Sequence, residues 1–294
     1  ALVAFLSCYG KLAVKSSKAG KLFNAVQKAQ VSWKRIRPLM RKQKPLPPLE
    51  IPAGRTLVIS DLSFSYGDGA PIFSGLSLTA QPGQIIGITG SVACGKSTLG
   101  RTFLCEAPYT GSIRWGNQEL RTLSPRDISA TVGYLGHDPE LWNDTVEANV
   151  LCGDDGRAMD YLKRTCLDGE VNDMEAGMQT VVGSGAVRLS GGQAQRLALA
   201  RTLAHPRPLL VLDDPFSALD RDTEDAIFEA LKQSSPGSII FLISHRLYHF
   251  PELDRVVFMD GGKVTVGTHQ ELLASCPGYR TLYESQTGGK RHEA

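Results

Sequence analysis

The first forty residues place apolar side chains at the spacing of an α-helix. Between Leu12 and Ile36 the apolar positions recur at helical intervals, and lysines fill the other face. Pro38 ends this pattern, and the stretch that follows, RKQKPLPPLEIPAG, contains four prolines and little else that could pack. The pattern predicts one long basic amphipathic helix followed by an extended linker, which is the one clear domain boundary.

Beyond the linker, short apolar runs alternate with helical patterns. TLVISDLSFSY, GLSLTA and GQIIGITG predict strands, and the continuous apolar runs PLLVLDD and GSIIFLIS are typical of buried strands in a parallel sheet. Helical spacing is found in KSTLGRTFL, SGGQAQRLALARTLA and RDTEDAIFEALKQ, and RVVFMDGGKVTVG predicts a hairpin that turns at Gly261-Gly262. Strands that alternate with helices predict an α/β fold with a mixed or parallel sheet.

These elements divide the chain into four parts. We expect residues 1–44 to form the helix and a basic arm, residues 45–55 the linker, residues 56–288 the α/β domain, and residues 289–294 a polar tail. Few strand signals occur between about residues 138 and 187, so we expect a helical insertion over about 138–200.

The charge of the chain is unevenly distributed, although the formal net charge of the 294 residues is only +2. The residues before Glu50 include eleven Lys or Arg and no acidic residue, which leaves 21 basic and 30 acidic residues in the remainder. A basic arm therefore precedes an acidic domain. Six cysteines are scattered without the paired spacing of a zinc site or a redox motif, which favours reduced cytosolic thiols.

The stretch GSVACGKS matches the phosphate-loop pattern G-x-x-x-x-G-K-[ST] and lies between a predicted strand and a predicted helix. Its glycines let backbone N–H groups converge on phosphates, and the helix N-terminus adds a partial positive charge. We expect Lys96 to reach the β- and γ-phosphates of a nucleotide and the Ser97 hydroxyl to ligate Mg²⁺. The residues expected to hold the nucleotide here are Gly90, Ser91, Val92, Ala93, Cys94, Gly95, Lys96, Ser97 and Thr98.

A second motif, LLVLDDPFSALD, places two carboxylates after a buried strand. Ligands bind at the carboxyl ends of strands in open α/β sheets, so we expect Asp213 to hold Mg²⁺, usually through water. Asp214 would then orient or deprotonate an attacking water. By itself such a pair is as often a helix cap or a solvated turn, but after a phosphate loop the catalytic interpretation is favoured. Together the two motifs predict a P-loop NTPase.

A third motif, LSGGQ, narrows the prediction. Ser190 and Gln193 form a capping box at the start of a helix, but two consecutive glycines there are unfavourable unless a ligand must approach the backbone closely. With this motif the chain resembles the ATP-binding cassette (ABC) family, whose signature is LSGGQ. The resemblance implies that two domains pack head to tail, with each signature contacting the ATP held by the partner. The residues it assigns are Leu189, Ser190, Gly191, Gly192 and Gln193.

Other residues match the family once the resemblance is stated, and it covers about residues 57–285. Tyr66 matches the aromatic residue that stacks on adenine, although it could equally be an ordinary strand tyrosine. Asp220 ends the SALD loop that communicates across the dimer. His245 matches the histidine that contacts the γ-phosphate and the attacking water, so Lys96, Asp214 and His245 are the expected catalytic residues. The implied fold adds an antiparallel β subdomain and a helical signature subdomain to the P-loop core.

Three positions depart from the family pattern. Asp214 replaces the usual Glu, which retracts the carboxylate, and a misplacement of about 1 Å can cost roughly a hundredfold in rate. His137 replaces a glutamine that ligates Mg²⁺, and imidazole is a poorer ligand for this hard ion. Ser184 stands where an acidic residue is usual. The phosphate loop and the signature are intact, so the chain resembles the degenerate half of a heterodimeric exporter. The alternative interpretation is a homodimer in which Asp214 works adequately.

The basic arm leaves two functions to compare. In the first, the arm is the cytoplasmic end of the last membrane helix of an exporter, as the positive-inside rule favours. The chain is then a motor on the cytoplasmic face of a membrane, with a transmembrane domain and a second ATP-binding domain as partners. In the second, a soluble ABC-type ATPase acts on nucleic acid or ribosomes through the arm. The acidic domain, and an arm with few aromatics among its basic residues, Phe23 and Trp33 beyond its start, favour the first.

The opening run ALVAFLSCY bears on the same choice. It lacks the basic region and cleavage signature of a signal peptide, and it is shorter than the roughly 20 apolar residues that span a bilayer. Since the chain begins without Met, we expect this run to be the cut end of a longer hydrophobic segment. The transported substrate is not encoded in these residues.

Overall fold

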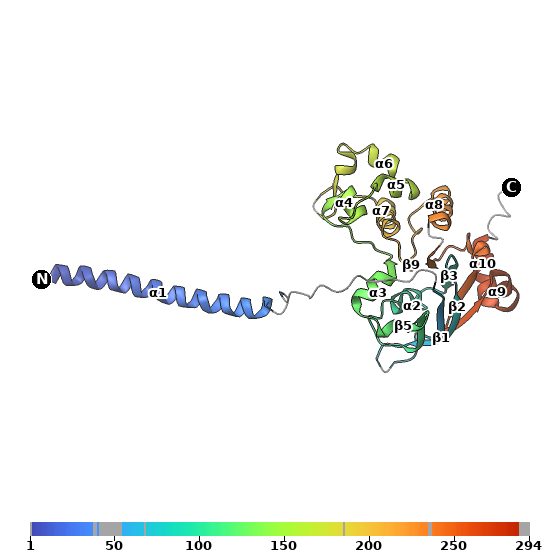
Figure 1. Cartoon of the computed structure of the whole chain (residues 1–294), viewed down its shortest axis with the longest axis horizontal. Coiled ribbons are helices and arrows are strands. Elements are labelled where there is room, and N and C mark those ends of the chain that lie inside the picture. The colour runs from blue at the N-terminus through green and yellow to red at the C-terminus, as the bar shows by residue number, and fades with distance from the viewer. Residues whose placement is uncertain are drawn as a thin grey trace. The chain divides into compact units, whose positions relative to one another are not determined.

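The computed structural model describes most of the chain, namely residues 2–37, 40, 55–67, 69–184, 186–234 and 237–287. All structural statements below refer to these residues. The chain divides into two compact units, residues 1–48 and residues 49–294 (Figure 1). The predicted linker, except Arg55, and the predicted polar tail lie outside the described residues.

The first unit contains a single long helix, α1 (Leu2–Ile36). The helix predicted from Leu12 onward is confirmed, and it begins ten residues earlier than the pattern indicated. Its described side chains are exposed, including the apolar Phe5, Leu22 and Trp33. None of the helices within the described residues combines the length and the apolar composition that a membrane span requires.

The second unit is built on a ten-stranded sheet in the order β5-β4-β1-β2-β12-β11-β3-β10-β9-β6. Its antiparallel part consists of β1 (Leu57–Phe64), β2 (Phe73–Ala80), β4 (Thr110–Trp115) and β5 (Gln118–Glu119). Its parallel part consists of β3 (Ile85–Gly90), β6 (Val132–Leu135), β9 (Leu209–Asp213), β10 (Ile239–Ile243) and β11 (Arg255–Asp260). Finally, β12 (Lys263–Gly267) forms the predicted hairpin with β11 and joins the two parts. The mixed α/β fold is confirmed.

The two continuous apolar runs became buried strands in the parallel part of the sheet, as predicted. Every residue of β9 and β10 is buried, because helices cover both faces of a parallel sheet. The pattern analysis missed β4, β5 and β6, which are short or interrupted by glycine. Of these, β6 matters for the site, because it pairs in parallel with β9 and leads directly to His137.

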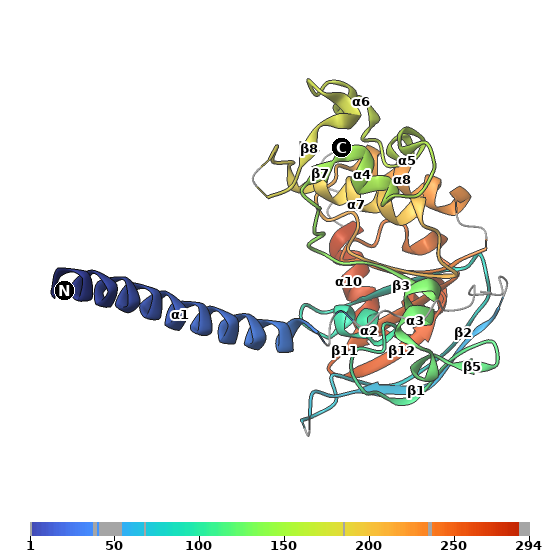
Figure 2. The ribbon, with the colours of Figure 1, turned by 60° about the vertical axis from the view of Figure 1, so that its left-hand side comes forward.

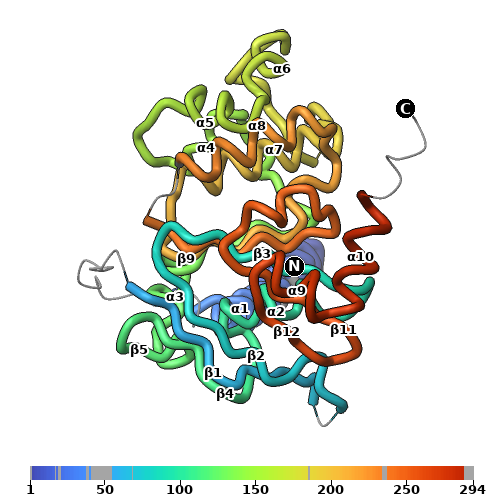
Figure 3. The backbone as a smooth tube through the Cα atoms, turned by 90° about the vertical axis from the view of Figure 1, so that its right-hand side faces the viewer, coloured from blue at the N-terminus to red at the C-terminus, as the bar shows by residue number. Residues whose placement is uncertain are grey.

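Two groups of helices surround the sheet (Figure 2). The helices close to the strands are α2 (Lys96–Thr102), α3 (Pro125–Thr131), α9 (His269–Ser275) and α10 (Pro277–Thr287). Helix α8 (Arg221–Ser234) lies next to the remaining helices (Figure 2). The others form a lobe at residues 144–204, here called the helical lobe: α4 (Val146–Leu151), α5 (Ala158–Arg164), α6 (Asp168–Asn172) and α7 (Gly191–Ala204). This lobe lies at the end of the unit opposite β1 and β4 (Figure 3). It is the predicted helical insertion, with one added two-stranded ladder of β7 (Asp144–Thr145) and β8 (Val181–Val182).

One helix, α7, is buried in two hydrophobic cores at once. Leu197 and Ala200 belong to the core of the helical lobe, with Val146 and Leu162. Leu199, Ala198 and Leu203 belong instead to the core that covers one face of the sheet. Residues one and two positions apart point in different directions on a helix, so α7 presents one apolar face to each core. The start of α7 is therefore held in a defined place relative to the sheet.

We predict that Leu199→Ala lowers the free energy of unfolding by about 2–5 kcal/mol, because it opens a cavity where α7 meets the sheet. Urea unfolding of the whole chain measures this. The matched control is Leu22→Ala, the same change at an exposed position of α1, which should cost less than about 0.5 kcal/mol. Equal small losses for both variants would contradict the buried role of Leu199.

Candidate functional site

The phosphate loop lies between the end of β3 and the start of α2, as predicted. Gly95 has a φ of 98°, and a Cβ there would lie 2.3 Å from Cγ2 of Ile72. A Cβ at Gly90 would lie 1.9 Å from the carbonyl oxygen of Met259. Both glycines are therefore needed for this path of the backbone, which any larger residue would displace. A backbone path that only glycine allows is typical of loops that bind phosphate through their N–H groups.

Lys96 is buried within this loop. Its Nζ donates to the carbonyl oxygens of Gly90 at 3.2 Å and of Ser91 at 2.8 Å. Among the described residues, no carboxylate forms an ion pair with Lys96. Lys96 Nζ also lies 3.8 Å from Sγ of Cys94. A buried ammonium with only these neutral partners fits a phosphate group, which would supply the missing negative charge. The residues present thus suit a nucleoside triphosphate.

Tyr66 lies beside the phosphate loop, with its ring largely exposed. Its hydroxyl oxygen is 3.5 Å from Oγ1 of Thr98, and its ring packs edge-on against Phe64 at 4.9 Å between centroids. An exposed aromatic ring in this place agrees with the expected stacking on adenine. The role itself stays a prediction.

The carboxyl ends of three neighbouring parallel strands bring the other predicted residues to the same edge. Ile88 of β3 is aligned with Ile243 of β10, and Ile243 is aligned with Asp213 of β9. His245 and the phosphate loop follow directly after these strands, and α2 packs over β9 and β10. The strand register therefore brings the loop, the two aspartates and His245 together.

Asp213 is buried and accepts a hydrogen bond at Oδ2 from the Tyr134 hydroxyl at 3.1 Å. Tyr134 was not singled out from the sequence, although it lies in β6 three residues before His137. Burial raises the pKa of the Tyr134 hydroxyl to about 12, so it remains a donor at neutral pH. The Tyr134 hydroxyl occupies only Oδ2 of Asp213, so Oδ1 can take another partner, which suits the predicted metal-binding role.

Asp214 has a left-handed backbone, with a φ of 53°, that is fixed on both sides. Its N–H donates to the carbonyl oxygen of Ile243 at 2.8 Å, and its own carbonyl accepts from Nε2 of Gln195 at 3.3 Å. Burial raises the pKa of the Asp214 carboxyl, while the neighbouring His245 and His137 oppose this shift. A buried carboxyl with a raised pKa at this edge is suited to accept a proton from water.

His137 lies against Asp214. Its Nδ1 is 3.8 Å from Oδ2 of Asp214, and its side chain is 55% exposed. His137 and Asp214 are two of the three departures from the family pattern. They are therefore neighbours in space, although they lie 77 positions apart in the chain. Its predicted role as a Mg²⁺ ligand stays a prediction.

The signature motif opens α7 with the predicted capping box. Ser190 Oγ accepts from the N–H of Gln193 at 3.2 Å, and Gln193 Oε1 accepts from the N–H of Ser190 at 2.8 Å. The two glycines differ in their surroundings. A Cβ at Gly192 would lie 2.9 Å from the carbonyl oxygen of Ala218, whereas one at Gly191 would meet nothing within 4 Å. Packing within the chain therefore explains Gly192 but not Gly191.

The signature residues lie in the helical lobe. In the described part of the chain, no hydrogen bond or ion pair joins Leu189 or Ser190 to the phosphate loop. Gln193 contacts its own lobe, where Nε2 donates to Oε2 of Glu170 at 2.6 Å. The described contacts of the signature residues are therefore within or beside the helical lobe.

Asp220 serves as the N-terminal cap of α8. Its carboxylate accepts from the N–H of Thr223 at 3.0 Å and from its hydroxyl at 2.8 Å, and these hydrogen bonds lower the pKa of Asp220. The cap is a sufficient structural reason for this aspartate. Its expected part in communication across a dimer stays a prediction.

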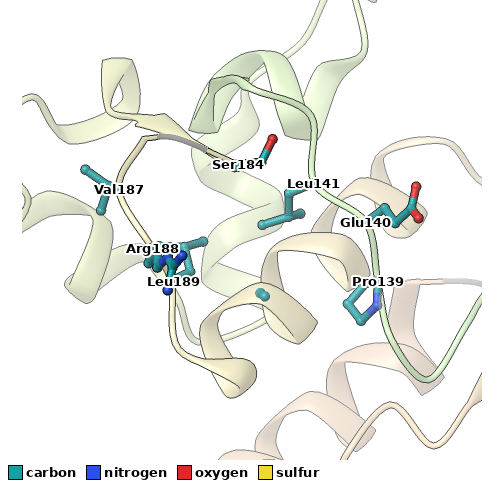
Figure 4. A pocket seen from close by; sticks show the side chains of 9 residues that line it. Pro139, Glu140, Leu141, Ser184, Val187, Arg188 and Leu189 are labelled. Carbon is teal, nitrogen blue, oxygen red and sulfur yellow. The ribbon is translucent and has the colours of Figure 1, made fainter.

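A cavity of about 530 Å³ separates the segment after His137 from the segment before the signature (Figure 4). Pro139, Glu140 and Leu141 line one side, and Ser184, the third departure from the family pattern, lines the other. Figure 4 shows Leu141 and Ser184 on opposite segments, with Arg188 and Leu189 closer to α7. The exposed apolar side chains of Trp142, Val181 and Val187 belong to the same two segments.

The fold and site define the class of protein: a P-loop nucleotide-binding domain with a separate signature lobe. Comparison with known proteins then shows the family. Residues 73–217 match the profile of the family described as ABC transporter, and the chain belongs to this family.

Curated relatives agree with this assignment. The chain is 31% identical over 296 residues to a probable multidrug resistance ABC transporter ATP-binding/permease protein, YheI, of Bacillus subtilis, a match covering 97% of the chain and 51% of YheI. It is 34% identical to an ATP-dependent lipid A-core flippase of Saccharophagus degradans, over 81% of the chain and 42% of the flippase. The chain thus spans about half the length of the relatives it matches, or less.

A solved structure is also similar. A bacterial Atm1-family ABC exporter with ATP bound aligns with a TM-score of 0.78 at 25% identity, covering 91% of this chain and 49% of that one. ABC transporter domains bind ATP with Mg²⁺, and ATP hydrolysis is the activity that this family implies.

We predict that Lys96→Ala weakens ATP binding about 10- to 100-fold, because a charge-assisted hydrogen bond contributes about 1.5–3 kcal/mol. Titration with a fluorescent ATP analogue in the presence of Mg²⁺ measures this. Lys163→Ala, at an exposed position of α5, removes the same charge away from the loop and serves as the control. Similar affinities for the two variants would mean that the loop does not hold the phosphates.

Proposed function

We propose that the chain is the ATP-binding and ATP-hydrolysing motor domain of an ABC exporter. The observation that carries this proposal is the division of the nucleotide site between two places in the fold. The phosphate loop, the aspartates and His245 lie at the sheet edge, while Ser190 and Gly191 lie in the helical lobe. Since no described residue comes within 4 Å of a Cβ at Gly191, the geometry favours a nucleotide presented there by a second domain, head to tail.

In the proposed reaction, a water oxygen attacks the γ-phosphorus of ATP and the bond to the β–γ bridging oxygen breaks, which releases ADP and phosphate. Lys96 offsets the charge of the phosphates, and His245 and Asp214 orient the water. The Asp214 carboxylate is placed to accept its proton. Mg²⁺, held by Ser97 and Asp213 with His137 as the further candidate ligand, would neutralise charge on the phosphate oxygens.

We further propose that this chain turns over ATP slowly at its own phosphate loop and pairs with a different, faster partner chain. In this chain the Asp214 carboxylate lies against the imidazole of His137. At these two positions the family usually has a glutamate, which is longer by one methylene, and a glutamine. Both substitutions move groups that the family places at the attacking water and the metal ion. Because the phosphate loop and the signature are intact, the chain keeps its ability to bind a nucleotide, and its LSGGQ motif can still contact the ATP held by the partner chain.

Two features of the chain support contact with a membrane domain. The first is the cavity between Leu141 and Ser184, flanked by the exposed apolar side chains of Trp142 and Val187, which offers a docking place for a transmembrane domain. The second is α1, whose first residues are apolar and uncharged up to Lys11, after which lysines recur. An apolar start followed by lysines is typical of a helix that leaves a membrane on its cytoplasmic face. It therefore favours this interpretation of α1 and not that of an arm that binds nucleic acid.

We predict that Gly191→Ala leaves folding and ATP binding unchanged but lowers ATP hydrolysis and ATP-dependent dimerisation at least about tenfold, because the added methyl lies where the partner nucleotide must approach. Light scattering and phosphate release with a hydrolysing partner present measure these properties. Gly192→Ala should instead destabilise the fold, since its Cβ would press on Ala218. If Gly191→Ala keeps full dimerisation and turnover, the head-to-tail site is wrong.

We predict that Asp214→Glu raises the ATPase rate of the purified chain about tenfold or more, because the longer side chain brings the carboxylate back to the attacking water. Phosphate release at saturating ATP and Mg²⁺ measures the rate. Asp173→Glu, an exposed position at the end of α6, controls for the added methylene. Rapid ATP turnover by the wild-type chain that Asp214→Ala abolishes would contradict the proposal of slow turnover at this phosphate loop. A homodimer would then be the better description.

A further inference from the structure

The turn that carries His245 is held by the final helix, α10. The side-chain amide of Gln286 donates from Nε2 to the carbonyl oxygen of His245 at 2.7 Å. The same amide accepts at Oε1 from the N–H of Leu247 at 3.0 Å. One half-buried side chain therefore pairs with a backbone acceptor and a backbone donor two residues apart, as a neighbouring strand would.

The opposite side of this turn is also fixed. Arg246 donates to Oε2 of Glu224 at 2.8 Å and to the carbonyl oxygens of Leu219 at 2.8 Å and Ser217 at 3.2 Å. Glu224 is only 1% exposed, and burying this carboxylate is tolerated because the guanidinium neutralises it. The turn is thus bonded to the SALD loop on one side and to α10 on the other, while the side chain of His245 stays exposed.

Helix α10 does not depend on Gln286 for its own place. Tyr279, near its start, is fully buried, its hydroxyl is 2.7 Å from Nδ1 of His269, and its ring packs edge-on against Phe258. Arg280 adds hydrogen bonds to the carbonyl oxygens of Leu273 and Ala274 at the end of α9. Removing the Gln286 amide should therefore release the turn on the α10 side, while leaving the helix docked.

We propose that Gln286 is a positioning residue for His245, setting where the imidazole stands relative to Asp214 and the γ-phosphate. This inference rests on the proposed function, because it takes His245 to contact ATP. Burial raises the pKa of the Asp214 carboxyl, and the backbone N–H of His245 opposes this rise, so the backbone of the turn and the carboxylate are already linked. Movement of the turn would displace two groups of the site together.

The test uses the full chain with Gln286→Met, which keeps the length and helix propensity of the side chain but removes both hydrogen bonds. Ser285→Met introduces the same residue at the neighbouring exposed position and serves as the control. ATP affinity is measured with a fluorescent analogue, and amide hydrogen exchange is followed over residues 244–248 with and without ATP and Mg²⁺. Phosphate release gives the turnover number and KM.

In Gln286→Met we expect ATP affinity and KM to stay within about twofold, since no group that binds phosphate is removed. The Leu247 amide should exchange about five- to tenfold faster, as expected for one lost hydrogen bond. Protection of the turn by ATP should be lost, and turnover should fall about tenfold. Gln286→Glu should restore protection of the Leu247 amide, because it keeps an acceptor there, but not turnover, because its carboxylate faces the His245 carbonyl.

The outcomes separate the two proposals. ATP protection and turnover in Gln286→Met equal to those of the wild type would overturn the inference, even with a lower melting temperature, because Gln286 would then be a structural residue. A fall in turnover of the same size in Ser285→Met would also overturn it. If the wild-type chain binds no ATP, the proposed function fails and this inference fails with it, whereas normal binding with an unchanged turn removes this inference alone.

Discussion

The parallel register of β3, β10 and β9 is the constraint on which the candidate site depends. Because Ile88, Ile243 and Asp213 are aligned across these strands, the segments that follow them leave the sheet at one edge. A slip of one residue would turn each side chain to the opposite face. The strands are buried on both faces, and the polar ends of β3 and β9 mark where each run must stop. Burial and register together therefore position the phosphate loop beside the two aspartates.

The helical lobe depends on the sheet through α7. Its two apolar faces are buried in different cores, so the N-terminus of α7 cannot move without disturbing one of them. Gly192 lies close to the SALD loop, and that loop is bonded through Arg246 to the turn of His245. A continuous set of contacts thus joins the signature to the sheet edge. It offers a physical route by which a nucleotide bound at one place could influence the other.

Much of the fold could be predicted from local patterns because its central elements are locally consistent. The buried runs of β9 and β10, the hairpin at Gly261-Gly262 and the capping box of Ser190 each carry their own signal within a few residues. By contrast, β4 and β6 are short and contain glycine, and they exist as strands because β1 and β9 supply hydrogen-bonding partners far along the chain. Such pairing leaves no periodic trace in the sequence.

For the site, the sequence by itself determined the family, the phosphate loop, the signature and the order of the motifs, because each is a run of adjacent residues whose backbone chemistry is local. Only the tertiary structure decided which distant side chains meet. It brought His137 to Asp214, Tyr134 to Asp213 and Gln286 to the backbone of His245. These contacts follow from strand order and helix docking, which long-range packing decides, so no spacing along the chain could have indicated them.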